Sequence, residues 1–199
     1  MQLLISDANI LIDMEEGLLI EPMFQLPYQF TIPDILFAEE LEVEHKYLLE
    51  LGLSQSELSG EMMAYAMELT SRYTKASRND CFALALAAQK ECALLTGDKS
   101  LRDAAETEAV LVRGTLWLVG LMVRQGLISI EQACEAYLKM KESGRRLPWT
   151  LAATELEELK NKGMDRWLVT SWVLFKYASS LTVYLSDGRL SAITLSRSF

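Results

Sequence analysis

Short apolar runs alternate with helical segments through most of this sequence, and that alternation restricts the possible folds. The runs are Gln2 to Ser6, Gln29 to Ile32, Ala93 to Thr96 and Val110 to Val112. Each is too short for a helix and is bounded by polar or turn residues, which is typical of buried strands. Strands that alternate with helices predict a parallel sheet with helices on both faces. We therefore predict an α/β fold that binds its ligands at the carboxyl ends of the strands.

Helices are predicted between the runs from hydrophobic spacing, capping residues and helix breakers. The pairs Ser54/Glu57 and Ser77/Asp80 have the spacing of capping boxes, which open helices. The predicted helices are Ile10 to Gly17, Asp34 to about Leu51, Ser54 to about Arg72, Ser77 to about Lys90, Leu101 to Glu106, Thr115 to Arg124, Ser129 to Lys141 and about Thr150 to Lys162. The helix in GTLWLVGLMVRQGL is apolar on nearly every face, so we expect it in the core or at an interface.

The last part of the chain has a different pattern. Two alternating runs between Leu181 and Leu195 flank Asp187-Gly188, which predicts a β-hairpin. An isolated two-stranded hairpin is marginally stable, so we expect this segment to pack against a partner, by preference one outside the chain. We place a boundary near Gly163, between a domain of residues 1–163 and an appendage of residues 164–199.

Net charge is distributed unevenly along the 199 residues. The chain carries a formal charge of −9, but residues 1–70 contain 14 acids and one base, whereas residues 71–199 contain 14 acids and 18 bases. A nucleic-acid partner is therefore not excluded, as it would be for a uniformly acidic protein. Arg72, Lys75 and Arg78 cluster ahead of Asp80, either as a solvated helix face or as a group that steers phosphate toward an acidic site.

Cysteine usage and the apolar segments indicate the compartment. Three cysteines without a CxxC spacing favour a reducing compartment over a disulfide or zinc scaffold. The first residues lack the features of a signal peptide, and no run is long enough for a membrane span. We therefore expect a cytoplasmic protein without a membrane partner.

Carboxylates occur where a parallel sheet would expose them. They are Asp7, the pair Glu39 and Glu40, Asp80 and Asp98. Each has a structural alternative: Asp7 as a helix N-cap, the glutamates as surface charges, Asp80 as the acid of a capping box, and Asp98 as a turn residue. These residues alone leave both interpretations open.

The motifs around these acids resemble those of PIN-domain nucleases, and among them the VapC-type toxin ribonucleases. DANILID, IPDILFAEEL, NDCFALALA and LLTGDKSLRDAA follow one another in order, and the resemblance covers about residues 1–145. It implies a three-layer α/β sandwich with a central parallel sheet. It also implies hydrolysis of RNA phosphodiester bonds that depends on Mg²⁺ or Mn²⁺.

The resemblance assigns roles to individual residues. It makes Asp7, Glu39, Asp80 and Asp98 the catalytic residues and metal ligands, with Glu39 favoured over Glu40 by its spacing from Pro33 and Leu36. Asn9 and Thr96 match polar positions near such a site, and Asp103 is a candidate outer acid. The sequence after Glu142 matches nothing in the family pattern.

The chemistry is consistent with these residue types. Clustered carboxylates repel one another, and a hard divalent cation that prefers oxygen ligands relieves that repulsion. The resemblance also implies an RNA substrate, a homodimer and a cognate antitoxin. Two alternatives stay open: a non-catalytic PIN-like scaffold that binds a protein, and a phosphoryl-transfer enzyme, although DANILID lacks the second Asp and the Thr of the haloacid-dehalogenase motif.

Other polar residues fit simpler roles. His45 is the only histidine and fits a solvated helix. Arg145 and Arg146 fit a solvated loop or a contact with RNA or a partner protein. The glycines form no pattern that binds nucleotide phosphates.

Overall fold

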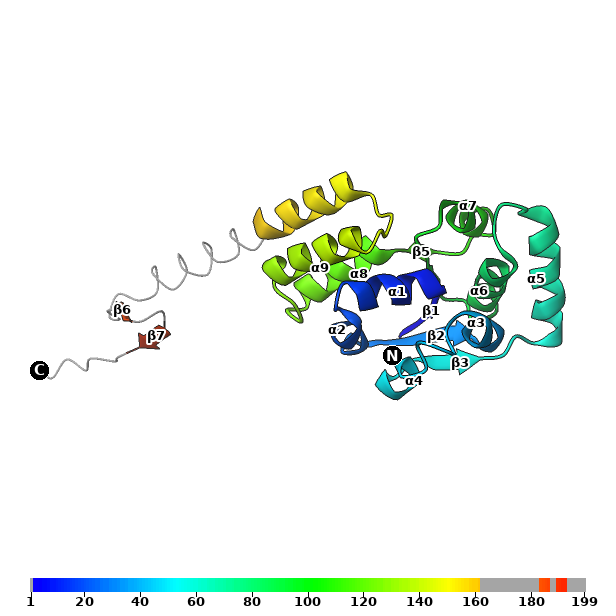
Figure 1. The fold of residues 1–199 in the computed structure, drawn as a ribbon, viewed down its shortest axis with the longest axis horizontal. Coiled ribbons are helices and arrows are strands. Elements are labelled where there is room, and N and C mark those ends of the chain that lie inside the picture. The colour runs from blue at the N-terminus through cyan, green and yellow to red at the C-terminus, as the bar shows by residue number, and fades with distance from the viewer. Residues whose placement is uncertain (1, 162–182, 187–188, 193–199) are drawn as a thin grey trace, which may run out of the picture. The chain divides into compact units, whose positions relative to one another are not determined.

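A five-stranded parallel sheet forms the centre of this computed structural model, which describes residues 2–161, 183–186 and 189–192. The strands lie in the order β3-β2-β1-β4-β5. They are β1 (Gln2–Ser6), β2 (Tyr28–Pro33), β3 (Ser54–Ser56), β4 (Ala93–Leu95) and β5 (Val112–Arg113). Helices flank the sheet on both sides (Figure 1), which confirms the predicted α/β three-layer sandwich.

β1 lies at the middle of the sheet. Ile5 pairs with Thr31 of β2 on one side and with Leu94 of β4 on the other. The backbone N–H of Asp7 then donates to the carbonyl of Leu95 at 3.0 Å, which ties the end of β1 to β4. Because all pairings are parallel, the carboxyl ends of these three strands meet at one edge of the sheet.

Helices fill the connections between the strands. Their bounds are α1 Ala8–Glu16, α2 Ile20–Phe24, α3 Asp34–Glu40, α4 Leu48–Leu51, α5 Gly60–Arg72, α6 Arg78–Gln89, α7 Lys99–Thr107, α8 Thr115–Arg124 and α9 Ile130–Glu142, and residues 149–161 are also helical. Figure 1 shows α1, α8 and α9 on one side of the sheet and α5, α6 and α7 on the other. Every residue from Cys81 to Ala87 of α6 is buried, and the small side chains of Ala83, Ala85 and Ala87 let the helix pack closely on its neighbours.

Two predicted helices are wrong in extent. Ser54–Ser56 does not open a helix but forms β3, which pairs with the outer edge of β2. α5 begins only at Gly60, with the side chain of Ser59 accepting from the N–H of Met62. The helix expected from Asp34 to Leu51 ends at Glu40. A longer helix would place the carboxylates between Glu39 and Glu44 on neighbouring turns, where their negative charges repel one another.

Other predictions are confirmed. α6 has the full capping box, because Ser77 and Asp80 each accept a hydrogen bond from the other's backbone N–H. α8 and α9 match their predicted ranges closely. α8 buries Leu118, Val119 and Met122 within the chain, so its apolar sequence does not by itself require a partner subunit.

The C-terminal strands are described by themselves. β6 (Val183–Ser186) and β7 (Arg189–Ala192) pair antiparallel. The Asp187-Gly188 turn, the boundary near Gly163 and the remaining tail lie outside the described residues, so the hairpin as a whole and its association stay predictions. By its contacts the chain divides into two units, Met1–Leu156 and Glu157–Phe199. Among the described residues, no helix has the length and apolar character needed to cross a bilayer.

The close contact of α1 with α9 gives a prediction for stability. A Cβ atom at Gly17, the C-cap of α1, would collide with Cε of Met140 and lie 3.3 Å from the carbonyl of Asp13. We predict that Gly17→Val lowers the free energy of unfolding by about 1 kcal/mol, the low end of the cost of overpacking, because the flexible end of the Met140 side chain can shift. Urea denaturation measures the change. Gly60→Val, at a position with open space around it, is the control. Equal effects of the two substitutions would contradict the packing argument.

Candidate functional site

Asp7 lies at the centre of the carboxyl edge. It follows β1 directly, caps α1, and its side chain is 1% exposed. Oδ1 accepts a hydrogen bond of 2.9 Å from the N–H of Ile10. Oδ2 is buried and has no hydrogen-bond partner among the described residues. The carboxylate therefore both caps a helix and keeps one unpaired oxygen in the interior.

Burial changes the proton affinity of Asp7. Loss of hydration raises its pKa to about 7, although the nearby hydroxyl of Thr96 and the hydrogen bond from the N–H of Ile10 act in the opposite direction. The charges of Asp80 and Asp13 raise the pKa further. Asp7, Asp80 and Asp13 therefore lie within electrostatic reach of one another.

Asp98 stands at the end of the neighbouring strand β4. It caps α7, with Oδ1 accepting a 2.8 Å hydrogen bond from the N–H of Leu101. Its own N–H donates to Oγ1 of Thr96 at 3.0 Å. Thr96 is fully buried and also acts on Asp7, so it connects the ends of β1 and β4. The expected turn residue is thus a helix cap.

Glu39 and Glu40 face the start of α6. Arg78 donates to both carboxylate oxygens of Glu39 at 2.6 and 2.7 Å, and the amide of Asn79 donates to Glu39 and Glu40. The hydrogen bonds from Asn79 and Arg78 lower the pKa of Glu39. These contacts hold the end of α3 beside the residue that precedes Asp80.

The four predicted acids are only partly gathered. Asp7 and Asp80 interact electrostatically, and Thr96 connects Asp7 with Asp98, but Glu39 is held by Arg78. Within the described part of the chain, no three His, Cys, Asp or Glu side chains form a group ready to hold a metal. The role of these acids as ligands stays a prediction.

Asp13 is a site residue that the sequence analysis missed. Its side chain is 5% exposed and accepts from the hydroxyl of Thr115 at 2.6 Å and from Nε of Arg145 at 2.5 Å. Arg145 also donates to the backbone carbonyl and to Oδ1 of Asn9, at 3.2 and 3.0 Å. The signal in the sequence was an acid, Asp13, between the buried Leu11 and Met14 of an apolar helix face.

Arg145 is placed by the end of α9. Gly144 has a φ of +80°, and the N–H groups of Gly144 and Arg145 donate to the carbonyls of Lys141 and Met140. This Schellman motif turns the chain back toward α1. Arg145 is therefore neither in a solvated loop nor free to bind a ligand, in contrast to the exposed Arg146.

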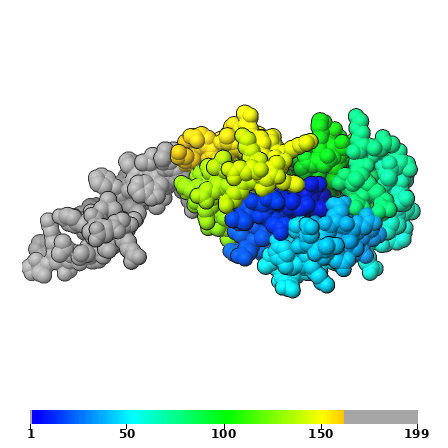
Figure 2. Space-filling view, in the orientation of Figure 1, coloured from blue at the N-terminus to red at the C-terminus, as the bar shows by residue number. Residues whose placement is uncertain are grey.

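A cavity of about 350 Å³ opens beside these groups. Asn9, Asp13, Asp98, Lys99, Arg145 and Arg146 are among the residues that line it. Asp7, Glu39 and Asp80 are not. In the space-filling view the dark blue surface of α1 lies between the yellow segment near residue 150 and the light blue surface that includes α3 (Figure 2).

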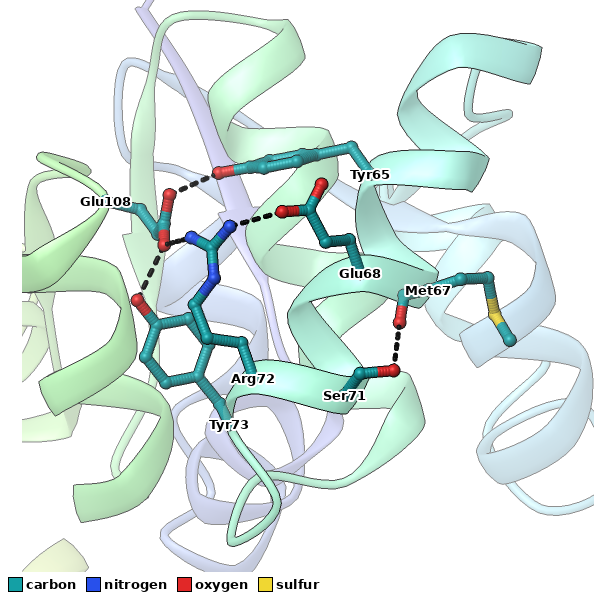
Figure 3. Close-up of polar contacts among 7 residues, drawn as sticks. All are labelled: Tyr65, Met67, Glu68, Ser71, Arg72, Tyr73 and Glu108. Carbon is teal, nitrogen blue, oxygen red and sulfur yellow. Dashed lines mark hydrogen bonds and ion pairs between the residues drawn. The ribbon is translucent and has the colours of Figure 1, made fainter.

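The basic cluster ahead of Asp80 is largely neutralised. Arg72 pairs with Glu68 and Glu108, and Glu108 also accepts from the hydroxyls of Tyr65 and Tyr73 at 2.7 and 2.6 Å (Figure 3). Hydrogen bonds from Tyr73 and Tyr65, with Arg72 close by, lower the pKa of Glu108. This network joins α5 to the residue that follows α7, so the contacts of Arg72 are structural.

Comparison with known families decides which family the fold belongs to. A family model described as "DUF3368: PIN domain" matches residues 3–161, the greater part of the chain. The chain belongs to this PIN-domain family. No curated protein matches it. One similar solved structure is a PilT N-terminus domain protein from the hyperthermophilic archaeon Sulfolobus solfataricus P2, with 15% identity and a TM-score of 0.41 over 62% of this chain and 94% of that chain.

The PIN domain thus includes every residue of the site described above. Asp7 to Arg145 all fall within the matched range. Family membership supports a nuclease-like fold, and the sequence motifs that resembled PIN domains were identified correctly. The sequence after Glu142, which matched nothing in the motif pattern, belongs to the domain as far as residue 161.

The buried carboxylate of this PIN domain gives a prediction for stability against pH. The folded chain binds the Asp7 proton with a pKa of about 7, against 3.8 as the ordinary value. The folded state thus holds more protons than the unfolded state between these pH values, so stability falls as the pH rises from about 4 to 7. Asp7→Asn keeps the cap and removes the charge. We predict that, in EDTA, the free energy of unfolding of this variant minus that of the wild type increases by about 2 kcal/mol from pH 5 to pH 8.

Urea denaturation at the two pH values measures this advantage. Asp34→Asn, at the start of α3, serves as a matched acid-to-amide control, because the Asp34 side chain is half-buried. An advantage for Asp7→Asn that does not change with pH would contradict the burial argument.

Proposed function

We propose that this PIN domain is a divalent-metal-dependent endoribonuclease that hydrolyses phosphodiester bonds in RNA. The observation that carries the proposal is the unpaired, buried Oδ2 of Asp7 at the carboxyl end of the central strand. A buried carboxylate oxygen without a hydrogen bond is costly, and a cation at this point would offset that cost. Asp80 and Asp98 supply further oxygen ligands from adjacent elements.

The donor set fits Mg²⁺ or Mn²⁺, which prefer oxygen ligands. Asp7, Asp80 and Asp98 would hold the ion directly or through water. Each uses one carboxylate oxygen for a helix cap and has its other oxygen available. Glu39 would complete the set by exchanging its contact with Arg78 for the ion. A bound divalent ion supplies an activated water and charge stabilisation at the phosphate.

The residues of the chain position this chemistry. Thr96 fixes the backbone of Asp98 next to Asp7, and Asn79 holds Glu39 beside the start of α6. Arg145 and Thr115 fix Asp13, whose charge keeps a negative potential near Asp7. An ionised carboxylate of the set accepts the proton of the attacking water.

The same proposal includes a biological role as the toxin of a toxin-antitoxin pair. The resemblance to VapC-type toxins supports a toxin that is held inactive by a cognate antitoxin, acting as a homodimer. Dimerisation is tested by light scattering at tens of micromolar, where a monomer would count against it.

A non-catalytic scaffold is the second candidate function. The ion pair between Arg78 and Glu39 favours it, because it occupies an acid that the nuclease needs. A phosphoryl-transfer enzyme is the third, and hydrolysis of small phosphate esters would identify it.

The test is cleavage of a labelled RNA with Mn²⁺. We predict that Asp98→Asn, which retains an acceptor for the cap of α7, reduces the rate by at least about tenfold, a barrier change of about 1.4 kcal/mol. Glu106→Gln removes an exposed charge from the same helix and should leave the rate unchanged. A wild-type protein that cleaves no RNA with any divalent metal would support the scaffold instead.

A further inference from the structure

A second cavity, of about 380 Å³, lies beside the first. Both cavities are lined by Gly97, Arg146 and Leu147, so they adjoin each other near the end of β4. The second extends over β5 and the start of α8, where Arg102, Arg113 and Trp117 line it. An extended molecule that contacts Asp98 in the first cavity is therefore close to the second.

Three arginines in the second cavity have no acidic partner. Among residues 2–161, the ion pairs involve other cations, and none is formed by Arg102, Arg113 or Arg146. In the same chain, whose net charge is −9, Arg72, Arg78 and Arg145 are all paired. Unpaired guanidinium groups in a concave site favour an anionic ligand.

The fold holds Arg102 against the cavity wall. Its Nη2 donates to the carbonyl of Thr96 at 3.0 Å. A Cβ atom on Gly114 would lie 3.1 Å from that same nitrogen, so a glycine lets the guanidinium lie close to the backbone. Arg102 is thus fixed beside Thr96, the residue that connects Asp7 with Asp98.

The side chains of Arg113 and Trp117 stack on each other and present planar groups beside the cavity. The guanidinium of Arg113 lies over the indole ring at 5.5 Å, and the ring of Tyr28 packs edge-on against the indole at 5.9 Å. Trp117 is half-buried, so part of the ring reaches the cavity. Aromatic and guanidinium planes of this kind stack the bases of single-stranded nucleic acid.

We infer that this cavity, the arginine groove, binds the single-stranded RNA that flanks the cleaved phosphodiester. Arg102, Arg113 and Arg146 contact its phosphates, and Trp117 stacks one of its bases. The inference rests on the proposed ribonuclease function, since it names the path of that substrate. A duplex fits less well, because its bases are already stacked on one another.

The test is binding of a fluorescently labelled 12-nucleotide RNA of random sequence in EDTA, measured by anisotropy. We predict that Arg113→Ala combined with Arg146→Ala weakens binding at least about tenfold. The slope of log K against log salt concentration should become shallower by the equivalent of about two phosphate contacts. Trp117→Leu should weaken binding of the single strand about tenfold and leave binding of a 12-base-pair duplex unchanged. Arg124→Ala, at the exposed far end of α8, removes one positive charge outside the groove and should bind as wild type.

The outcomes separate this inference from the proposed function. RNA binding that depends on the groove, in a protein that cleaves no RNA, would support the groove and reject the ribonuclease. Mn²⁺-dependent cleavage with unchanged binding and rate in the groove variants would reject the groove alone. Equal weakening by Arg146→Ala alone and by Arg124→Ala, each of which removes one positive charge, would overturn the inference, because net charge would then explain the binding. Arg146→Ala alone, at an exposed position, tests the groove if the other variants fail to fold.

Discussion

The parallel pairing of β1 between β2 and β4 is the constraint on which the candidate site depends. It brings the ends of three strands to one edge, and the hydrogen bond from Asp7 to Leu95 closes that edge. The chain enters α1 immediately afterwards, so Asp7 must lie inside the protein. Burial then raises its pKa and leaves Oδ2 unpaired. The fold thus places an electrostatic cost at the position where the proposed metal would bind.

The structural and functional interpretations of the acids turn out to be compatible. Asp7, Asp80 and Asp98 all accept hydrogen bonds that cap helices, which is a structural role for an acid at the start of a helix. A cap needs only one carboxylate oxygen, so the same residue can offer the second to a ligand. Helix starts at the carboxyl edge therefore combine local stability with carboxylate oxygens that the caps leave unused.

Much of the fold could be predicted because its signals are local. The apolar run of β1 and the capping box of α6 each depend on residues close together in sequence. β3 could not be predicted, because Ser54–Ser56 has no apolar residue and becomes a strand only by pairing with β2. The contacts of Asp13 with Arg145 and of Glu39 with Arg78 were missed for a similar reason: the partners are 132 and 39 residues apart, and only the folded chain brings them together.

A crystal structure with Mn²⁺ tests most directly whether the carboxyl edge holds a divalent cation. Anomalous diffraction locates manganese independently of the protein model. We predict a manganese peak within about 2.0–2.4 Å of Oδ2 of Asp7, with Asp80 or Asp98 as a further ligand. A fully ordered carboxyl edge without a manganese peak, at a Mn²⁺ concentration that labels other sites, would contradict the account.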